Sequence, residues 1–140
     1  MAIFLTSSPT GPLDNSRKVD GLDKMNHFVD QLKKYWKDNS KCCIIAASHN
    51  DYDENDEMCN FFKEVFFKEN LSIECLNLID ERYSNFTKDD LMNYDVILLG
   101  GGHVPTQNKF FKEIQLREKI KDFNGIIIAI SAGSMNSADI

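Results

Sequence analysis

Short runs of apolar residues are spaced along the chain, with polar stretches between them. Several runs are too uniformly apolar for strands that keep one face in water. They predict strands of a mostly parallel sheet that is covered on both faces. The predicted strands are Ala2–Thr6, Cys42–Ala47, Ser72–Leu78, Val96–Leu99 and Ile126–Ile130.

The stretches between the predicted strands carry apolar residues at helical spacing. Strands and helices therefore alternate, which predicts βαβ units with right-handed crossovers and an α/β fold. A chain of 140 residues fits one domain, which we place at 1–140. The predicted helices are 23–38, a second one around 58–66, a short one at 88–93 and a fourth at 106–121.

Composition and charge exclude several classes of protein. The chain has 27% charged and 42% hydrophobic residues and a net charge of −6. This balance is typical of a globular protein and disfavours nucleic acid as a partner, because phosphate backbones require a basic surface. No apolar run approaches the ~20 residues of a membrane span, and no basic region precedes the first apolar stretch as in a signal peptide.

The four cysteines do not form a C-x-x-C pair. Cys42 and Cys43 open a predicted strand, so we expect free and largely buried thiols in a cytoplasmic protein, with no metal or cofactor. The acidic stretch 51–57 resembles the opening of a calcium loop, but Asp56 stands where that loop needs glycine. We interpret these acids as the start of a helix, where they favour the positive end of its dipole.

Ser131 is the strongest candidate for chemistry. An apolar run ends abruptly in Ala129-Ile130-Ser131-Ala132-Gly133, which matches the nucleophile elbow G-x-S-x-G with alanine in the first position. Such a turn raises the serine hydroxyl above the end of a strand and places the next backbone N–H, that of Ala132, where an oxyanion forms. An ordinary strand followed by a Ser-Gly loop is the alternative interpretation.

A second small-residue turn strengthens the first one. The predicted strand Val96–Leu99 runs into Gly100–Gly102 and then His103. No Gly-Lys-Ser/Thr follows, so this is not a phosphate-binding P-loop. Three glycines leave N–H groups accessible, as an oxyanion hole requires. Turns after two parallel strands lie at the same edge of a sheet, so we expect this loop and Ser131 to be neighbours.

The segments 100–111 (GGGHVPTQNKFF) and 125–136 (GIIIAISAGSMN) resemble the glycine loop and the nucleophile segment of peptidase family S51, which includes dipeptidase E and the cyanophycinases. The likeness covers about residues 94–138. It implies a flavodoxin-like three-layer sandwich, related to class I glutamine amidotransferases. By this resemblance Ser131 is the nucleophile of a serine peptidase. The family's members include enzymes that cleave dipeptides with an N-terminal aspartate.

The resemblance also implies roles for the residues around Ser131. The backbone of Gly101 or Gly102, together with Ala132, forms the oxyanion hole, and His103 and Gln107 lie near the substrate. Family members carry the catalytic histidine well downstream of the serine, whereas this sequence ends nine residues after it. We therefore expect the chain to be an N-terminal portion of such a protein, with the C-terminal part of the sheet missing, and to be inactive alone.

Histidines within the sequence are alternative bases, since a base must come within about 3 Å of the serine oxygen. His103 is the best placed, His49 the next and His27 the least, but we favour loop or surface roles for all three. The leading hypothesis is a serine peptidase acting on small peptides. The alternatives are amidotransferase-like chemistry, which normally uses a cysteine in the elbow, and a domain without catalysis. An exposed sheet edge predicts self-association.

Overall fold

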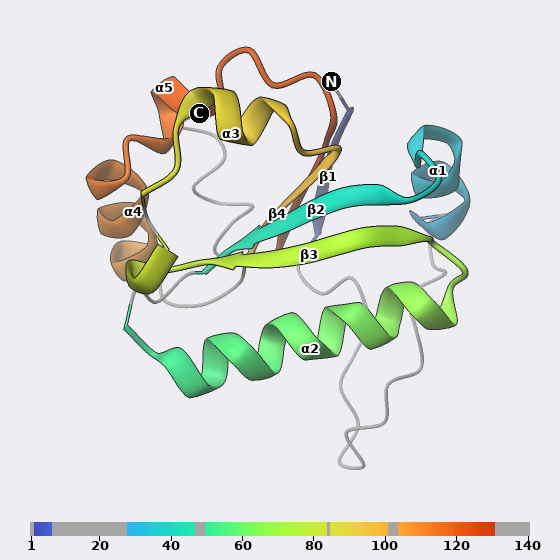
Figure 1. Cartoon of the computed structure of the whole chain (residues 1–140), viewed down its shortest axis with the longest axis horizontal. Coiled ribbons are helices and arrows are strands. Elements are labelled where there is room, and N and C mark those ends of the chain that lie inside the picture. The colour runs from blue at the N-terminus through green and yellow to red at the C-terminus, as the bar shows by residue number, and fades with distance from the viewer. Residues whose placement is uncertain (1, 7–27, 47–49, 84, 101–103, 131–140) are drawn as a thin grey trace.

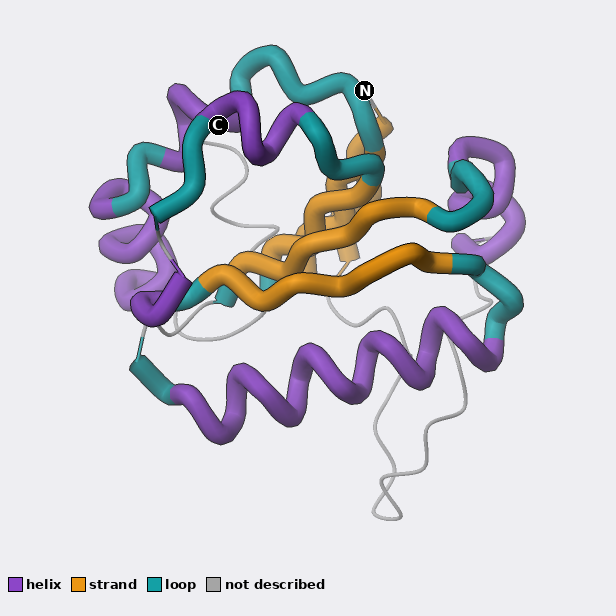
Figure 2. The backbone as a smooth tube through the Cα atoms, in the orientation of Figure 1, coloured by secondary structure: helices purple, strands orange, loops and turns teal. Residues whose placement is uncertain are grey.

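The computed structural model of the chain describes residues 2–6, 28–46, 50–83, 85–100 and 104–130. Strands and helices alternate along these residues, as Figures 1 and 2 show, which confirms the predicted α/β class. The elements are β1 (Ala2–Thr6), α1 (Phe28–Tyr35), β2 (Ser40–Ile45), α2 (Tyr52–Lys68), β3 (Ile73–Ile79), a 3-10 helix at Glu81–Tyr83, α3 (Lys88–Met92), β4 (Val96–Leu99), α4 (Val104–Glu113), α5 (Leu116–Ile120) and β5 (Ile126–Ile130).

The five strands form one sheet in the order β1-β5-β4-β2-β3, and every neighbouring pair is parallel. The register places Leu99 of β4 beside Ala129 of β5 and beside Ile45 of β2. Ala129 in turn lies beside Leu5 of β1. The carboxyl ends of β1, β5, β4 and β2 therefore meet at one edge of the sheet.

Helices cover both faces of this sheet. Successive residues of a strand point to opposite faces of the sheet. The buried apolar side chains form two clusters, one on each face, and β2, β4 and β5 contribute to both. One face packs against α1 and α2, and the other against α3, α4 and α5 (Figure 1). The result is the three-layer flavodoxin-like sandwich that the resemblance implied.

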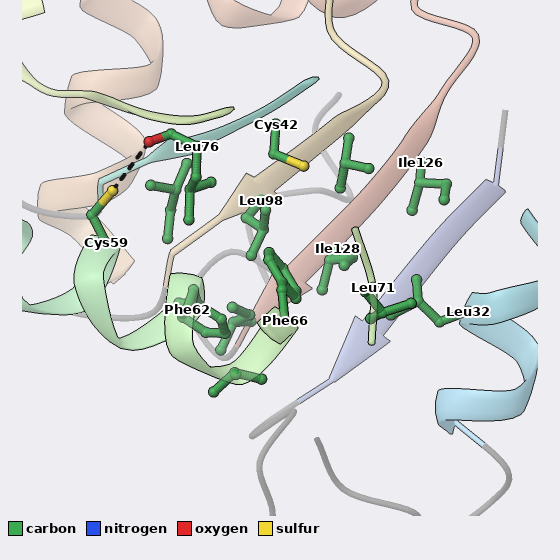
Figure 3. Close-up of a cluster of buried hydrophobic side chains, with 14 residues drawn as sticks. Leu32, Cys42, Cys59, Phe62, Phe66, Leu71, Leu76, Leu98, Ile126 and Ile128 are labelled. Atoms are coloured by element: carbon green, nitrogen blue, oxygen red, sulfur yellow. Dashed lines mark hydrogen bonds between the residues drawn. The ribbon is translucent and has the colours of Figure 1, made fainter. Parts of the chain in front are cut away.

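The cluster beneath α2 contains a group of packed aromatic side chains. Phe66 is wholly buried, its ring centroid lies 5.2 Å from that of Trp36, and Phe62 lies beside it. Figure 3 shows Phe62 and Phe66 of α2 facing Leu98 of β4 and Ile128 of β5, together with a long hydrogen bond (3.6 Å) from the Cys59 thiol to the Leu76 carbonyl. The buried members are Leu32, Cys42, Ile44, Cys59, Phe62, Val65, Phe66, Leu71, Leu76, Val96, Leu98, Ile126, Ile128 and Ile130.

The helices that follow the neighbouring strands β2 and β4 pack on opposite faces of the sheet. After β2 the next helix is α2, which packs on the first face, and after β4 it is α4, which packs on the second. Two adjacent parallel strands with crossovers on opposite faces define a topological switch point, where open α/β sheets leave a crevice for ligands. The switch point lies at Ile45 and Leu99, at the carboxyl edge of the sheet.

Asp95 joins three strands at the opposite edge of the sheet. Its backbone N–H donates to the Lys41 carbonyl, its side chain accepts from the Lys41 N–H, and its carbonyl accepts from the Ile126 N–H at 2.9 Å. The chain passes so close to Asp95 that a Cβ on Gly125 would lie 2.2 Å from the Asp95 carbonyl oxygen.

Replacing Gly125 with alanine is expected to lower the free energy of unfolding by about 1–3 kcal/mol, as overpacking usually does. The added methyl group would also meet the Phe123 ring at 2.6 Å, so the backbone must move to accommodate it. Urea denaturation measures the change, with the exposed Lys121→Ala as the matched control. A loss no larger than that of the control would contradict this reading of the contact.

Three sequence expectations need correction. The expected helix 106–121 is two helices, because Gln115 adopts a left-handed conformation (φ 55°) that ends α4 and lets Leu116 and Ile120 be buried. Strands β2 and β3 are displaced by one or two residues from the expected ranges. The sequence also leads us to expect Phe61, Phe62, Phe66 and Phe67 in the core, but Phe67 is 83% exposed and does not join Phe62 and Phe66 there.

Other expectations are confirmed. The first two cysteines and Cys59 are buried, and all four thiols are free. The acids Asp53 and Glu54 lie in the first turn of α2, where the helix dipole favours them. The short helix at 88–93 is present as α3, and Thr87 begins it with a reciprocal capping box to Asp90.

Candidate active site

The predicted site residues divide into two groups. Gln107 is described and lies in α4. Ser131, Ala132, Gly101, Gly102 and His103 lie outside the described residues, as do His27 and His49. The structure therefore describes the ends of the strands that lead to these residues, the neighbouring helices and the side chains between them.

The two predicted turns leave the sheet side by side. Leu99 and Ala129 are register partners on β4 and β5, and neighbouring strands lie about 4.8 Å apart. The residue that follows Leu99 is Gly100, and Ile130 ends β5 one position before Ser131. The glycine loop and the serine segment thus start from adjacent points at the same edge, as the sequence predicted.

Gly100 is held closely from the β2 side. Its backbone N–H donates to the Ile45 carbonyl at 2.9 Å, which extends the pairing of β4 with β2 by one residue. A Cβ at this position would lie 3.2 Å from the Ile45 oxygen and 3.3 Å from the Met58 thioether. A side chain at this position would therefore be tightly packed between β2 and α2.

Gln107 holds Gly100 from the other side. Its side chain is wholly buried, and its Nε2 donates a hydrogen bond to the Gly100 carbonyl. Because α4 follows the glycine loop directly, its second turn brings this amide back to the loop's first residue. The resemblance to the family places Gln107 near the substrate, and the described structure places its buried amide on the backbone of Gly100, where the glycine loop begins.

A second polar cluster lies at the carboxyl end of β3, on the α2 side of the switch point. Asp80 is wholly buried there, and it accepts hydrogen bonds from the Asn55 side chain and from both the backbone and the guanidinium of Arg82. Arg82 also binds Asp56 at 2.8 Å. We call the residues Asn55, Asp56, Asp80 and Arg82 the Asp80 cluster.

The charges within the Asp80 cluster compensate one another. Burial raises the pKa of the Asp80 carboxyl, but the hydrogen bonds from Arg82 and Asn55 outweigh it and the net pKa is lowered. The hydrogen bonds to Asp80 and Asp56 raise the pKa of Arg82. The guanidinium also lies over the Tyr52 ring, 4.3 Å from its centroid, a cation–π contact. Arg82 is thus committed to two carboxylates and is not available to bind an acidic substrate.

Sequence reasoning missed the Asp80 cluster. Asp80 follows an apolar run directly, as polar residues at the carboxyl end of a buried strand do, and this was the available signal. Asn55, which donates to Asp80, and Asp56, which accepts from Arg82, come from the start of α2, about 25 residues away, and only the packing of α2 against β3 brings them together.

The buried thiols are poor candidates for a nucleophile. Burial raises the pKa of Cys42 to about 12 and raises those of Cys43 and Cys59 as well. The thiolate is the reactive form of cysteine, and these three side chains remain protonated at neutral pH. The described thiols therefore contribute to packing.

Two further classes of feature were sought in the described ranges. They contain no group of three or more His, Cys, Asp or Glu residues placed to hold a metal ion. None of the helices in these ranges has the length and apolar character to cross a membrane. A hollow of about 1120 Å³ runs along β3 between α2 and α3, two positions from β4 and three from β5 in the strand order. It therefore lies apart from the predicted site.

Comparison with known proteins gives one family. The model of peptidase family S51 matches residues 13–139, which include the glycine loop, α4 and the serine segment. No curated protein matches the chain.

Proposed function

The chain belongs to peptidase family S51, and on this premise we propose that it hydrolyses small peptides with Ser131 as the nucleophile. The observation that supports the assignment most is the register of β4 and β5. It brings Gly100 and Ile130, the residues before the two predicted turns, to neighbouring positions at the carboxyl edge of the sheet. A serine placed there would be within reach of N–H groups from the glycine loop.

The proposed reaction proceeds through an acyl-enzyme. The Ser131 oxygen attacks the carbonyl carbon of the scissile peptide and its proton passes to a general base, while the C=O electron pair moves onto the oxygen. Backbone N–H groups of Gly101 or Gly102 and of Ala132 stabilise this oxyanion. The C–N bond then breaks, the amine leaves with the proton, and water hydrolyses the acyl-serine to release the acid.

The general base is assigned only by the resemblance to the family. Family members carry it downstream of the nucleophile, while His49 and His103 come after β2 and β4 in this sequence. We propose loop roles for these two histidines. Hydrolysis should therefore be compared between the 140-residue chain and a longer chain that carries a downstream histidine.

We propose small peptides as substrates, with N-terminal aspartyl dipeptides favoured by the resemblance. Arg82 is paired with Asp80 and Asp56, so it does not supply the cationic contact for such a substrate. Amidotransferase-like chemistry ranks lower, because position 131 is serine and the described buried thiols have raised pKa values.

We also propose that the chain self-associates through an exposed sheet edge. At the edge strand β3, the exposed Glu74 lies beside a register shift and opposes continuous strand pairing.

A panel of small peptides tests the proposed activity. Dipeptides with N-terminal Asp, Ala or Lys, and an N-acetylated Asp dipeptide, are incubated with the chain and with the longer chain, and amine release is measured. We expect release by the longer chain, fastest from free N-terminal Asp. Ammonia released from glutamine would favour the amidotransferase alternative, and no release from any compound would favour a domain without catalysis.

A further inference from the structure

Strand β3 lies at one end of the strand order, and among the described strands it pairs only with β2 (Figure 1). The backbone groups of successive strand residues point alternately to the two sides of the strand. The Ile79 carbonyl accepts a hydrogen bond from the Ala46 N–H, so the groups of Ile79 face β2. Two residues of the same strand, Leu78 and Leu76, therefore direct their N–H and C=O groups to the outer edge.

The hollow of about 1120 Å³ lies along this outer edge. It is larger than the ~300–1,000 Å³ of typical small-molecule pockets, which favours a protein surface over a small ligand as its occupant. One side of α2 contributes Asp56, Asn60 and Lys63 to its wall. The wall thus carries both signs of charge, as a surface that binds another surface of mixed charge would.

Five residues at helical spacing form a stripe on this side of α2. Intervals of three or four residues place them on one face of the helix, and all five are exposed. Phe67, at one end, is 83% exposed, so packing within the described part of the chain does not account for its apolar ring. We call these residues the α2 stripe: Tyr52, Asp56, Asn60, Lys63 and Phe67.

The α2 stripe is complementary to itself when it is reversed. The aromatic residues Tyr52 and Phe67 form its two ends, and the oppositely charged Asp56 and Lys63 lie symmetrically between them, about a midpoint beside Asn60. A two-fold axis at this midpoint sets two α2 helices antiparallel. Each Asp56 then faces Lys63 of the second copy, and each Tyr52 faces Phe67 of the second copy, as an interface made from one patch on both copies requires.

The same axis suits the edge strand. Cys59 precedes Asn60, and its thiol donates to the carbonyl of Leu76, the central residue of β3. A two-fold axis beside Leu76 sets the outward N–H and C=O of this residue against those of the same residue in the second copy, as in an antiparallel pair. Glu74 limits the pairing to this centre, so the α2 stripes supply most of the contact.

We propose that a second copy of the chain occupies this edge, in a two-fold dimer that buries the α2 stripe and the centre of β3. The inference deepens the self-association proposed above and rests on it, but not on hydrolysis by Ser131. Tyr52 and Asp56 both contact Arg82 within their own copy, at 4.3 Å from the Tyr52 ring centroid and 2.8 Å from the Asp56 carboxylate. Their positions are therefore set before the dimer forms, which lowers the cost of association.

Sedimentation of the 140-residue chain over a range of concentrations tests the inference. Lys63→Glu sets like charges against each other twice in the dimer, so its dissociation constant should rise about 10-fold. Phe67→Ala removes an aromatic contact at both ends of the interface and should raise the constant about 10–100-fold. Lys112→Glu, exposed on α4 at the opposite face of the sheet, changes the net charge equally and should match the original chain.

A mixture of two charge variants tests the predicted pairing itself. Asp56→Lys alone and Lys63→Glu alone each create two like-charge contacts per dimer. In a dimer with one copy of each variant, the new lysine faces the new glutamate, and the remaining native acid and base face each other. We therefore expect the mixture to associate about as tightly as the original chain. Folded variants that fail to recover association on mixing would overturn the inference.

The outcomes separate this interface from the proposals on which it depends or does not depend. If the original chain is a monomer at every concentration tested, the proposed self-association fails and the inference with it. If it dimerises but folded Lys63→Glu and Phe67→Ala dimerise as tightly, the inference alone is wrong. Should Asp56→Lys not fold after losing its bond to Arg82, an unchanged constant for Lys63→Glu would overturn the inference equally. Peptide release is measured separately, and its absence bears only on the assignment of Ser131.

Discussion

Replacing Arg82 with alanine is expected to lower the free energy of unfolding by about 1–3 kcal/mol, the cost of leaving the buried Asp80 carboxylate without its charged hydrogen-bond donor. Asp80 is wholly buried, and the Arg82 guanidinium binds it at 2.8 Å while also contacting Asp56. Without Arg82 the Asp80 carboxylate keeps only the Asn55 side chain among these side-chain partners. Chemical denaturation measures the loss.

The exposed Arg117→Ala is the matched control, because it removes the same side chain from the surface and should change stability by no more than about 0.5 kcal/mol. A similar small change for Arg82→Ala would show that the Asp80 cluster does not hold β3 against α2.

The pH dependence of stability gives an independent view of the same cluster. The pKa of Asp80 is lowered in the folded chain, so its ionised form contributes stability above the unfolded pKa of about 3.8. This contribution is lost as the pH falls through the lower folded pKa. Asp80→Asn should be less stable than the original chain at pH 7, and the difference should shrink at acidic pH. A difference that grows on acidification would contradict the assigned sign.

Replacing Ser131 with alanine is expected to abolish peptide release by the longer chain. Removal of a nucleophilic serine leaves the oxyanion hole and binding contacts, so any residual rate should lie several orders of magnitude below the original. Ser134→Ala is the matched control, since it removes the same hydroxyl three residues further along the segment. Equal activity in Ser131→Ala would remove Ser131 from the reaction.

Much of the fold follows from the sequence because its strands are almost continuously apolar. A buried parallel strand needs apolar side chains on both faces, and β4 and β5 are buried along their whole length. The break at Gln115 could not be predicted in this way. Residues 106–121 keep a helical apolar pattern, but burial of Leu116 and Ile120 against the sheet favours two shorter helices joined by a left-handed residue.

The parts of the candidate site that consist of short sequence patterns could be predicted. The glycines after β4 and the small residues around Ser131 are visible in the sequence, and the parallel sheet makes their proximity a geometric consequence. The contact of Gln107 with Gly100 was not predictable, because only the packing of α4 brings its amide back to that residue. The Asp80 cluster depends in the same way on the packing of α2 against β3.

The most direct test of the central claim is to identify the residue that a fluorophosphonate probe modifies. The 140-residue chain and a longer chain with a downstream histidine are labelled, digested and examined by mass spectrometry, with Ser131→Ala and Ser134→Ala as paired variants. We predict one adduct on the longer chain, on the peptide that contains Ser131, which is lost in Ser131→Ala and kept in Ser134→Ala. Absence of an adduct on both chains, or an adduct that survives in Ser131→Ala, would contradict the assignment of Ser131 as the nucleophile.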